Sequence, residues 1–486
     1  MTDETEQGTS ATLWAGVYSI TALILFVVLV LLGLVMRLGQ SGAVAVRPDY
    51  FYAIMTLHGL GMAGVLYTAG YAANWYLVSK YVQPSVALMR FNFVLILLGV
   101  VGLIVATLVG RFGPGWYMLY PLPFLTTWAG WSIGLAVLSV MLLGTAWLLG
   151  QLDLLRVFAG KYGLSGMLGW QYFGKGETRN ELPPMILIVA VSMIAGAITT
   201  IVGAGMLMLY LAQWLAPDLQ FDALLMKNAV FLFGHTLVNI TMYCGVAVVY
   251  ELLPEYSGRP WKTNAIVALS WNAVLLLVLF AFFHHLYMDF AQPIAVQYFG
   301  QIASFMSAVP ATVVTIFGAM AQVYRSGIRW NFVPLSLFFG LMGWIIGGLA
   351  AVVDSTIAVN SYFHNTLWVP AHFHTYFLVG FVFMLFSFVY HLVDAKAEKL
   401  AKLSLGTMMV GGYGFLLMFY LAGLESVPRR YASYASIRIS SVMEFGQMSA
   451  GIAAVCVAVF VVGMLMYYTT VLGSFGKWSA RIRTGT

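Results

Sequence analysis

The chain has 486 residues, of which 61% are hydrophobic and only 8% are charged. This mixture excludes a soluble globular protein. The formal net charge of +6 does not indicate nucleic acid binding, because the cations gather in loops on one side of the predicted structure.

Twelve apolar runs are long enough to cross a bilayer, which predicts an all-α integral membrane protein with one domain over residues 1–486. The first run follows a short acidic segment without a basic n-region, so we interpret residues 1–12 as a tail before a retained span. The predicted spans cover residues 13–37, 48–79, 87–110, 121–150, 183–214, 224–253, 263–288, 293–323, 331–357, 366–393, 402–423 and 444–473.

Loop charge predicts the orientation of these spans. The opposite side has seven cations, which are Arg37, Arg47, Arg111, Lys227, Arg429, Arg430 and Arg438. The tails and the even-numbered connections, including a long loop at 154–182, have sixteen: Lys80, Arg90, Arg156, Lys161, Lys175, Arg179, Arg259, Lys262, Arg325, Arg329, Lys396, Lys399, Lys402, Lys477, Arg481 and Arg483. The positive-inside rule therefore predicts that both termini are cytoplasmic.

The two cysteines, Cys244 and Cys456, both fall inside spans and are not part of a CxxC motif. This pattern excludes an iron–sulfur cluster, a zinc ribbon or a covalently attached haem on this chain. We interpret both cysteines as packing residues.

Histidines are the main functional signal. One buried histidine is often a hydrogen-bonded packing residue, but ionisable groups inside a membrane are costly and usually functional. His364 lies in an outer loop, and His391 lies at the cytoplasmic end of a span. At about 1.5 Å of rise per residue, the other six fall in one layer in the outer third of the membrane: His58, His235, His284, His285, His372 and His374.

Helical geometry divides this layer into sites. His372 and His374 are about 200° apart around a helix, so they face opposite sides and cannot share a metal. His284 and His285 can converge with His235 on one copper, iron or zinc ion and leave a position open for substrate. His58 and His374 would give a low-spin haem two axial imidazoles, whereas His372 alone would leave a second haem five-coordinate.

The motifs "TLHG", "FGH", "FHHLYMD", "HNTLWVPAHFH" and "VPRRY" resemble those of the haem–copper oxidase superfamily catalytic subunit, subunit I, over all twelve spans. The resemblance implies that His58 and His374 ligate a low-spin haem and that His372 ligates a high-spin haem. It implies that a second metal, copper or non-haem iron, binds His235, His284 and His285. Haem propionates would bind the remaining residues of the motifs, His364, Arg429 and Arg430.

The wording "HNTLWVP" and the segment "ELLP" resemble the B-type branch, and span 8 lacks the lysine of A-type members. Hydroxyl groups form a candidate proton path from the cytoplasm to the second metal. These are Tyr250, Ser307, Thr312 and Thr315.

One expected residue is missing. Oxygen-reducing members of the A and B branches have a tyrosine four residues after the span-6 histidine, where this chain has Asn239. An amide cannot supply the fourth electron for dioxygen cleavage, and neither Tyr243 nor Tyr287 is a convincing substitute. Reduction of two nitric oxide molecules needs only two electrons, so the chain resembles a respiratory nitric oxide reductase. We expect the Asn239 amide to face the metal cavity.

The implied cofactors are two b-type haems and one second metal, in the inner membrane and surrounded by lipid. The implied partners are a small second subunit with a periplasmic cupredoxin-like or cytochrome domain and a donor such as cytochrome c, cupredoxin or quinol. The alternatives are a terminal oxidase with an unusual electron donor, a haem-carrying sensor, and a secondary transporter. A transporter would place its charged sites at mid-membrane between inverted repeats, whereas this histidine layer lies further outward.

Overall fold

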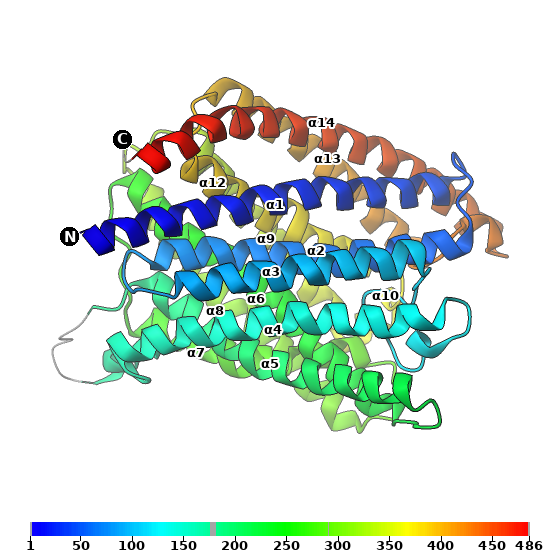
Figure 1. Cartoon of the computed structure of the whole chain (residues 1–486). Coiled ribbons are helices and arrows are strands. Elements are labelled where there is room, and N and C mark those ends of the chain that lie inside the picture. Colours follow the sequence, from blue (N-terminus) through cyan, green and yellow to red (C-terminus); the bar gives the residue numbers. More distant parts are fainter. Residues whose placement is uncertain (1, 175–180, 290, 485–486) are drawn as a thin grey trace.

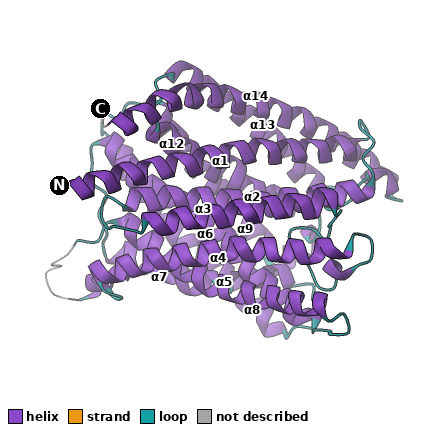
Figure 2. Cartoon of the chain, in the orientation of Figure 1, coloured by secondary structure: helices purple, strands orange, loops and turns teal. Residues whose placement is uncertain are grey.

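The computed structural model describes residues 2–174, 181–289 and 291–484, and within this part of the chain it contains helices and no strand (Figure 2). Lys175 and Arg179, which the charge rule counts, lie outside the described residues, as do the side chains of Arg481 and Arg483. Twelve of the described segments are long and apolar enough to cross a membrane. The predicted fold class is therefore confirmed.

The helices form one elongated bundle, and both termini lie at the same end of it (Figure 1). We call this the terminal end, and we call the opposite end, which carries Arg429 and Arg430, the arginine end. The long helices are α1 (Thr2–Ser41), α2 (Pro48–Val78), α3 (Val86–Ile104), α4 (Gly130–Tyr162), α5 (Pro184–Leu215), α6 (Ala223–Ser257), α7 (Ala265–Val278), α8 (Ile294–Val323), α9 (Phe332–Asp354), α13 (Glu398–Leu424) and α14 (Ser440–Thr484). The tenth membrane segment is divided into α11 (Trp368–Tyr376), the π-helix η6 (Phe377–Phe381) and α12 (Val382–Leu392).

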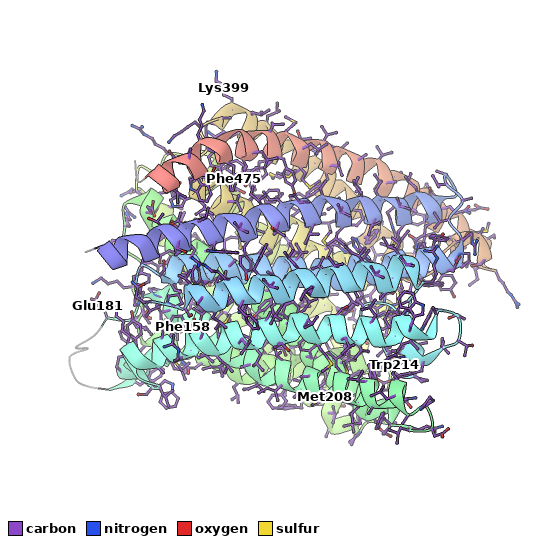
Figure 3. All side chains as sticks on the ribbon, in the orientation of Figure 1. Phe158, Glu181, Met208, Trp214, Lys399 and Phe475 are labelled. Carbon is purple, nitrogen blue, oxygen red and sulfur yellow. The ribbon has the colours of Figure 1, made fainter. Side chains whose placement is uncertain are left out.

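Local sequence explains where several helices begin and end. α6 begins after Asp222, whose side chain accepts a hydrogen bond from the Leu225 amide at 2.7 Å, and it ends at Gly258 with a φ of +67°. α7 begins after Asn264, which caps the Val267 amide in the same way. Large apolar side chains such as Met208, which is 56% exposed, project from the bundle where lipid would surround it (Figure 3).

Three predicted boundaries differ from the structure. The span expected at 121–150 is α4, which begins at Gly130, because Pro121 and Pro123 interrupt the preceding segment and leave only the 3-10 turn η2 (Leu122–Phe124). α4 continues to Tyr162 into the expected loop at 154–182, which otherwise contains the 3-10 turns η3 (Gly166–Leu168) and η4 (Trp170–Phe173). Within the tail expected at 1–12, residues 2–12 are the first part of α1.

Shorter elements sit where the chain approaches the histidines. The π-helix η1 (Val105–Val109) ends the α3 span, the 3-10 helix η5 (Ala281–Leu286) follows α7, α10 (Ile357–Phe363) precedes α11, and the 3-10 turn η7 (Tyr434–Ser436) precedes α14. His284 and His285 therefore lie on a 3-10 segment and not on the regular helix that the sequence predicts.

Candidate metal and haem site

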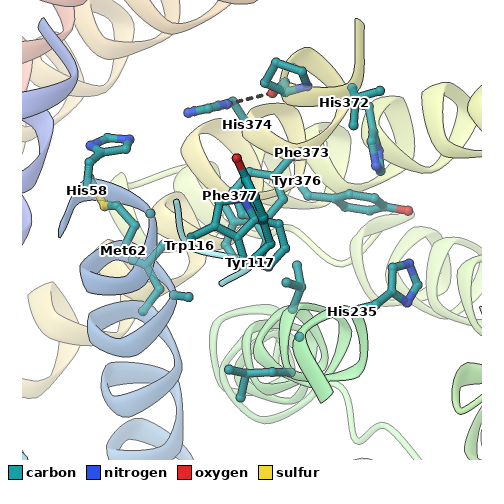
Figure 4. A pocket seen from close by; sticks show the side chains of 18 of the residues that line it. His58, Met62, Trp116, Tyr117, His235, His372, Phe373, His374, Tyr376 and Phe377 are labelled. Carbon is teal, nitrogen blue, oxygen red and sulfur yellow. Dashed lines mark hydrogen bonds between the residues drawn. The ribbon is translucent and has the colours of Figure 1, made fainter. Parts of the chain in front are cut away.

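One cavity of about 360 Å³ connects the six histidines of the predicted layer. Apolar and aromatic side chains form most of its wall, and α11 crosses it (Figure 4). The six histidines that line it are His58, His235, His284, His285, His372 and His374. The structure thus brings all six together, as the common depth in the sequence predicts.

His58 on α2 and His374 on α11 form a facing pair. Their ring centroids are 6.4 Å apart and their ring planes differ by 21°. The Nδ1 atom of His58 lies 2.7 Å from the Leu29 carbonyl oxygen, and that of His374 lies 2.6 Å from the Pro370 carbonyl oxygen. Because a carbonyl only accepts, both Nδ1 atoms carry the proton, and both Nε2 atoms are left to bind a metal.

A glycine provides room for this pair. A Cβ atom at Gly33 on α1 would lie 3.0 Å from Cε1 of His58, so a larger residue there would displace the ring.

His235, His284 and His285 form a second cluster. Their candidate ligand nitrogens all lie within 4.8 Å of one another. Three nitrogens bound at roughly 2 Å to one metal ion lie about 3.3–3.5 Å apart. The rings therefore need only a small movement to bind an ion.

Ser304 on α8 orients His284. Its hydroxyl donates to the Gly300 carbonyl at 2.7 Å, and its oxygen lies 3.0 Å from His284 Nδ1. The hydroxyl therefore accepts the Nδ1 proton, which leaves Nε2 unprotonated. Among the described residues, this buried Nε2 has no hydrogen-bond partner. An unpartnered nitrogen at this position fits a metal ligand, because buried polar atoms are otherwise satisfied.

His372 lies on the same helix as His374 and points to the other side of it, as Figure 4 shows. Its ring is 5.5 Å from that of Tyr376, which also lines the cavity. The two side chains thus lie on different sides of α11, as their spacing of two residues predicts.

The arginine end of the cavity is strongly cationic. Arg429 donates to the Asn365 side-chain oxygen at 3.0 Å, and the Arg430 guanidinium lies 3.8 Å above the Tyr117 ring. Among the described residues, neither guanidinium has a carboxylate within salt-bridge distance. Burial lowers the pKa of His364, at the C-cap of α10, to about 4, and Arg429 and Lys227 contribute in the same direction. The two guanidiniums are thus half-buried cations without a paired carboxylate of their own among the described residues, which suits bound carboxylates.

Sequence reasoning missed several residues of this cavity, among them Arg37, Trp116 and Tyr117. Arg37 lies 4.8 Å above the Phe419 ring, and its buried Nη1 has no partner among the described residues. A lone arginine at the end of an apolar span is the signal for it. Trp116 and Tyr117 line the cavity from the segment between η1 and η2, which the misplaced span boundary concealed.

Asn239 lies one turn after His235 and lines the cavity, as predicted. Its Nδ2 atom, however, is 2.9 Å from the His235 carbonyl oxygen and 3.2 Å from His235 Nδ1. The amide thus contacts the histidine itself. The two tyrosines considered as substitutes have other contacts: Tyr243 packs on Trp271 at 5.3 Å, and the Tyr287 hydroxyl donates to the Ser355 carbonyl at 3.2 Å.

The candidate proton path is partly continuous. The hydroxyls of Tyr250 and Thr315 are 3.0 Å apart, and Ser307 lines the cavity. Thr312 instead donates to the Ala308 carbonyl of its own helix at 2.8 Å. Toward the terminal end, Ser257 donates to Gln322 at 3.0 Å, a contact that sequence reasoning missed.

A twelve-span helical bundle with a layer of converging imidazoles inside the membrane defines a membrane protein built to hold metal cofactors. The family described as "Cytochrome C and Quinol oxidase polypeptide I" matches residues 14–456. The chain therefore belongs to the haem–copper oxidase subunit I family, whose members are oxidoreductases that bind haems and a further metal.

Curated relatives and a solved structure agree with this. The chain is 25% identical over 437 residues to "Cytochrome c oxidase subunit 1" of Thermostichus vulcanus, covering 86% of this chain and 76% of that protein. It is 26% identical over 410 residues to the protein of the same name from Synechocystis sp., covering 80% and 71%. A solved haem–copper terminal oxidase dimer shares the fold with a TM-score of 0.78 at 19% identity, covering 96% of this chain and 84% of the solved chain.

Proposed function

We propose that the chain is the catalytic subunit of a respiratory nitric oxide reductase from the B-type branch. The observation that carries the proposal is Asn239, which occupies the position beside His235 with its amide 3.2 Å from the imidazole. A neutral amide cannot release the proton and the electron that a phenol supplies. Reduction of two NO to N2O and water takes two electrons and two protons, so it does not need that phenol.

The six histidines of the cavity fall into three sets, one for each proposed cofactor. His58 and His374 would hold a low-spin b-type haem, and His372 would hold a high-spin one. His235, His284 and His285 would hold copper or non-haem iron. When bound, these groups supply the electrons and the binding position for NO. The apolar wall of the cavity excludes water from the reactants.

At the arginine end, Arg37, Arg429 and Arg430 would neutralise the haem carboxylates. His364, which is neutral near pH 7 because its pKa is about 4, would donate a ring N–H to one of them. Each guanidinium provides several N–H donors in a fixed plane, which suits paired contacts to carboxylates. Without those anions, the cluster would leave half-buried cations unpaired, which is costly.

Protons would come from the terminal end. Gln322 and Ser257 would form the entrance, Tyr250 and Thr315 the middle, and Ser307 the exit into the cavity. The hydroxyl of Ser304 is then the last polar group before His284. We propose that this end faces the cytoplasm of an inner membrane, as the loop charges indicate.

Electrons would enter from a partner. The chain has no CxxCH motif and no cysteine pair for a copper centre of its own. We therefore propose a small second subunit with a periplasmic cupredoxin-like or cytochrome domain over the arginine end. The donor would be cytochrome c, a cupredoxin or quinol.

The decisive experiment is turnover of the purified complex with NO and with dioxygen, together with metal analysis. The proposal predicts N2O formation from NO and slow dioxygen reduction by the same preparation. Rapid four-electron reduction of dioxygen without N2O formation from NO would overturn it.

One observation favours a second candidate, an oxygen reductase. Tyr376 lines the cavity beside His372, and sequence reasoning did not consider it. A phenol there is the unusual electron donor that a terminal oxidase with Asn239 would need. Tyr376→Phe separates the candidates. It should abolish dioxygen reduction and its protein radical in an oxidase, and should leave NO turnover largely intact in a reductase, because phenylalanine keeps the ring in the cavity wall and removes only the hydroxyl.

A further inference from the structure

Lys227 and Asp289 form an ion pair next to the three-histidine cluster. Lys227 Nζ lies 2.7 Å from Asp289 Oδ1 and 2.6 Å from Oδ2. The Lys227 side chain is 27% exposed and the Asp289 side chain 25% exposed. Solvent-exposed ion pairs contribute little because water and salt screen them. This pair is about three-quarters covered, so screening weakens it less.

The position of the pair relates it to the metal site. Lys227, Phe231 and His235 are spaced four residues apart on α6, so they lie on one face of the helix. Phe231 stacks on the His285 ring at 5.3 Å, and the His235 ring lies 5.2 Å from that of His285. Asp289 follows His285 by four residues. The two chain segments thus run antiparallel, and the ion pair closes the end of their contact.

The segment that carries His284 and His285 needs such contacts. It is the 3-10 helix η5, whose hydrogen bonds have poorer geometry than those of an α-helix. Ser304 attaches it to α8, and the Tyr287 hydroxyl attaches it to α9. Toward α6, Lys227–Asp289 is joined by a contact of 3.3 Å between the Gln292 and Asn228 side chains.

We propose that Lys227 and Asp289 are positioning residues for the second metal, which hold η5 at the distance from α6 at which His235 meets His284 and His285. The inference rests on the proposed metal site, and not on the choice between NO and dioxygen as substrate. Neither residue touches the cluster nitrogens, so their effect is on ligand geometry and not on ligand number.

The test compares metal retention in the whole complex. The variants are Lys227→Met, Asp289→Asn and the exchanged pair Lys227→Asp/Asp289→Lys. The second metal is measured per haem by elemental analysis, and its release into excess EDTA is followed over time. The matched control is Lys262→Met, which breaks a 3.0 Å pair with Glu181 at the terminal end (Figure 3), where the two side chains are 65% and 73% exposed.

We expect both single variants to release the metal faster by roughly 10-fold, the low end of the range for groups that orient ligands from outside the coordination shell. The variant with the exchanged pair should release the metal at a rate close to that of the wild type, and Lys262→Met should release it at the wild-type rate. The low-spin haem spectrum should not change in any of them.

Asp289→Asn is nearly isosteric, so we expect this variant to assemble even if Lys227→Met does not. A wild-type rate of metal release from Asp289→Asn would overturn the proposed positioning role. An effect of Lys227→Met without one from Asp289→Asn would do the same, since Lys227 would then act alone. Absence of any second metal in the wild-type complex would instead refute the metal site on which the positioning role depends.

Discussion

The two histidine sites of this protein are held in different ways. Backbone carbonyls accept the Nδ1 protons of His58 and His374, whereas the Ser304 hydroxyl accepts that of His284 and the Asn239 amide approaches His235. His58 and His374 also lie on regular α-helix, but His284 and His285 lie on a 3-10 helix.

This difference indicates which of the two histidine sites is more sensitive to side-chain substitution. A carbonyl partner remains whatever side chain stands there, so substitution of Leu29 leaves the hydrogen-bond acceptor of His58 in place. The three-histidine site depends on side chains from α6, α8 and η5, each of which a single mutation can replace. We therefore expect the chemistry of the second site to vary more readily within one fold, as the amide at Asn239 suggests.

Removal of either histidine of the His58–His374 pair should have the largest effect. We expect His58→Ala and His374→Ala each to abolish the low-spin haem spectrum completely, because one imidazole cannot give a six-coordinate bis-imidazole iron. Optical and EPR spectra of the reduced and oxidised complex provide the measurement. A surviving bis-imidazole signal in either variant would refute the pair.

Asn239→Leu tests the three-histidine site at the position where the sequence analysis expected a tyrosine. The substitution keeps the volume and removes the contact to His235, so we expect NO turnover to fall by roughly 10–100-fold, as for other partners of metal-bound histidines. Steady-state NO consumption is the measurement, and unchanged low-spin haem absorbance is the control. Full activity would mean that His235 does not depend on the amide.

Ser304→Ala sharpens the comparison, because it removes the hydroxyl that orients His284 and leaves the other ligands intact. We expect the second metal to bind about 10-fold more weakly, again at the lower end of the range for such partners. Titration with a chelator measures this. Ser304→Thr, which keeps the hydroxyl, should restore most of the affinity if orientation is the cause.

Tyr250→Phe asks whether the terminal end of the bundle serves the metal site. Loss of the hydroxyl that contacts Thr315 should slow turnover by about 3- to 10-fold, because a bound water can replace part of its hydrogen bonding. Thr312→Val, whose hydroxyl is engaged with its own helix, is the matched variant with a smaller expected effect. If both variants turn over at the wild-type rate, protons reach the site from the arginine end.

The smallest effect concerns His364, which is held by its loop. Burial lowers its pKa from 6.5 to about 4 in the folded chain, so the folded state binds this proton less tightly than the unfolded state does. The resulting stability loss is absent above pH 6.5 and grows as the pH falls toward 4. His364→Gln should therefore reduce the acid sensitivity of thermal unfolding between pH 6.5 and 4, and equal melting curves across that range would contradict the shift.

Much of the fold could be predicted because its constraints are local. Twelve apolar runs of bilayer length require twelve spans, since backbone groups in lipid must be hydrogen-bonded within each segment. The helical period then separates His372 from His374, and the direction of each span places six histidines at one depth. Those two simple rules were sufficient to identify the cavity and its six imidazoles.

Other features depend on contacts between residues far apart in the sequence. The end of the seventh span forms a 3-10 helix, which is stabilised by contacts with α6, α8 and α9. Nothing in the motif "FHHLYMD" predicts it. Trp116 and Tyr117 enter the cavity because a proline-rich connection folds back into the bundle.

The same distinction holds at Asn239. The sequence by itself determined that an amide stands where a phenol was expected, since that requires only the position of one residue after His235. Only the tertiary structure decided that this amide contacts His235 and that Tyr376 reaches the same cavity, because side-chain direction depends on how neighbouring helices pack. Periodicity sets which face a residue occupies, and packing sets what that face meets.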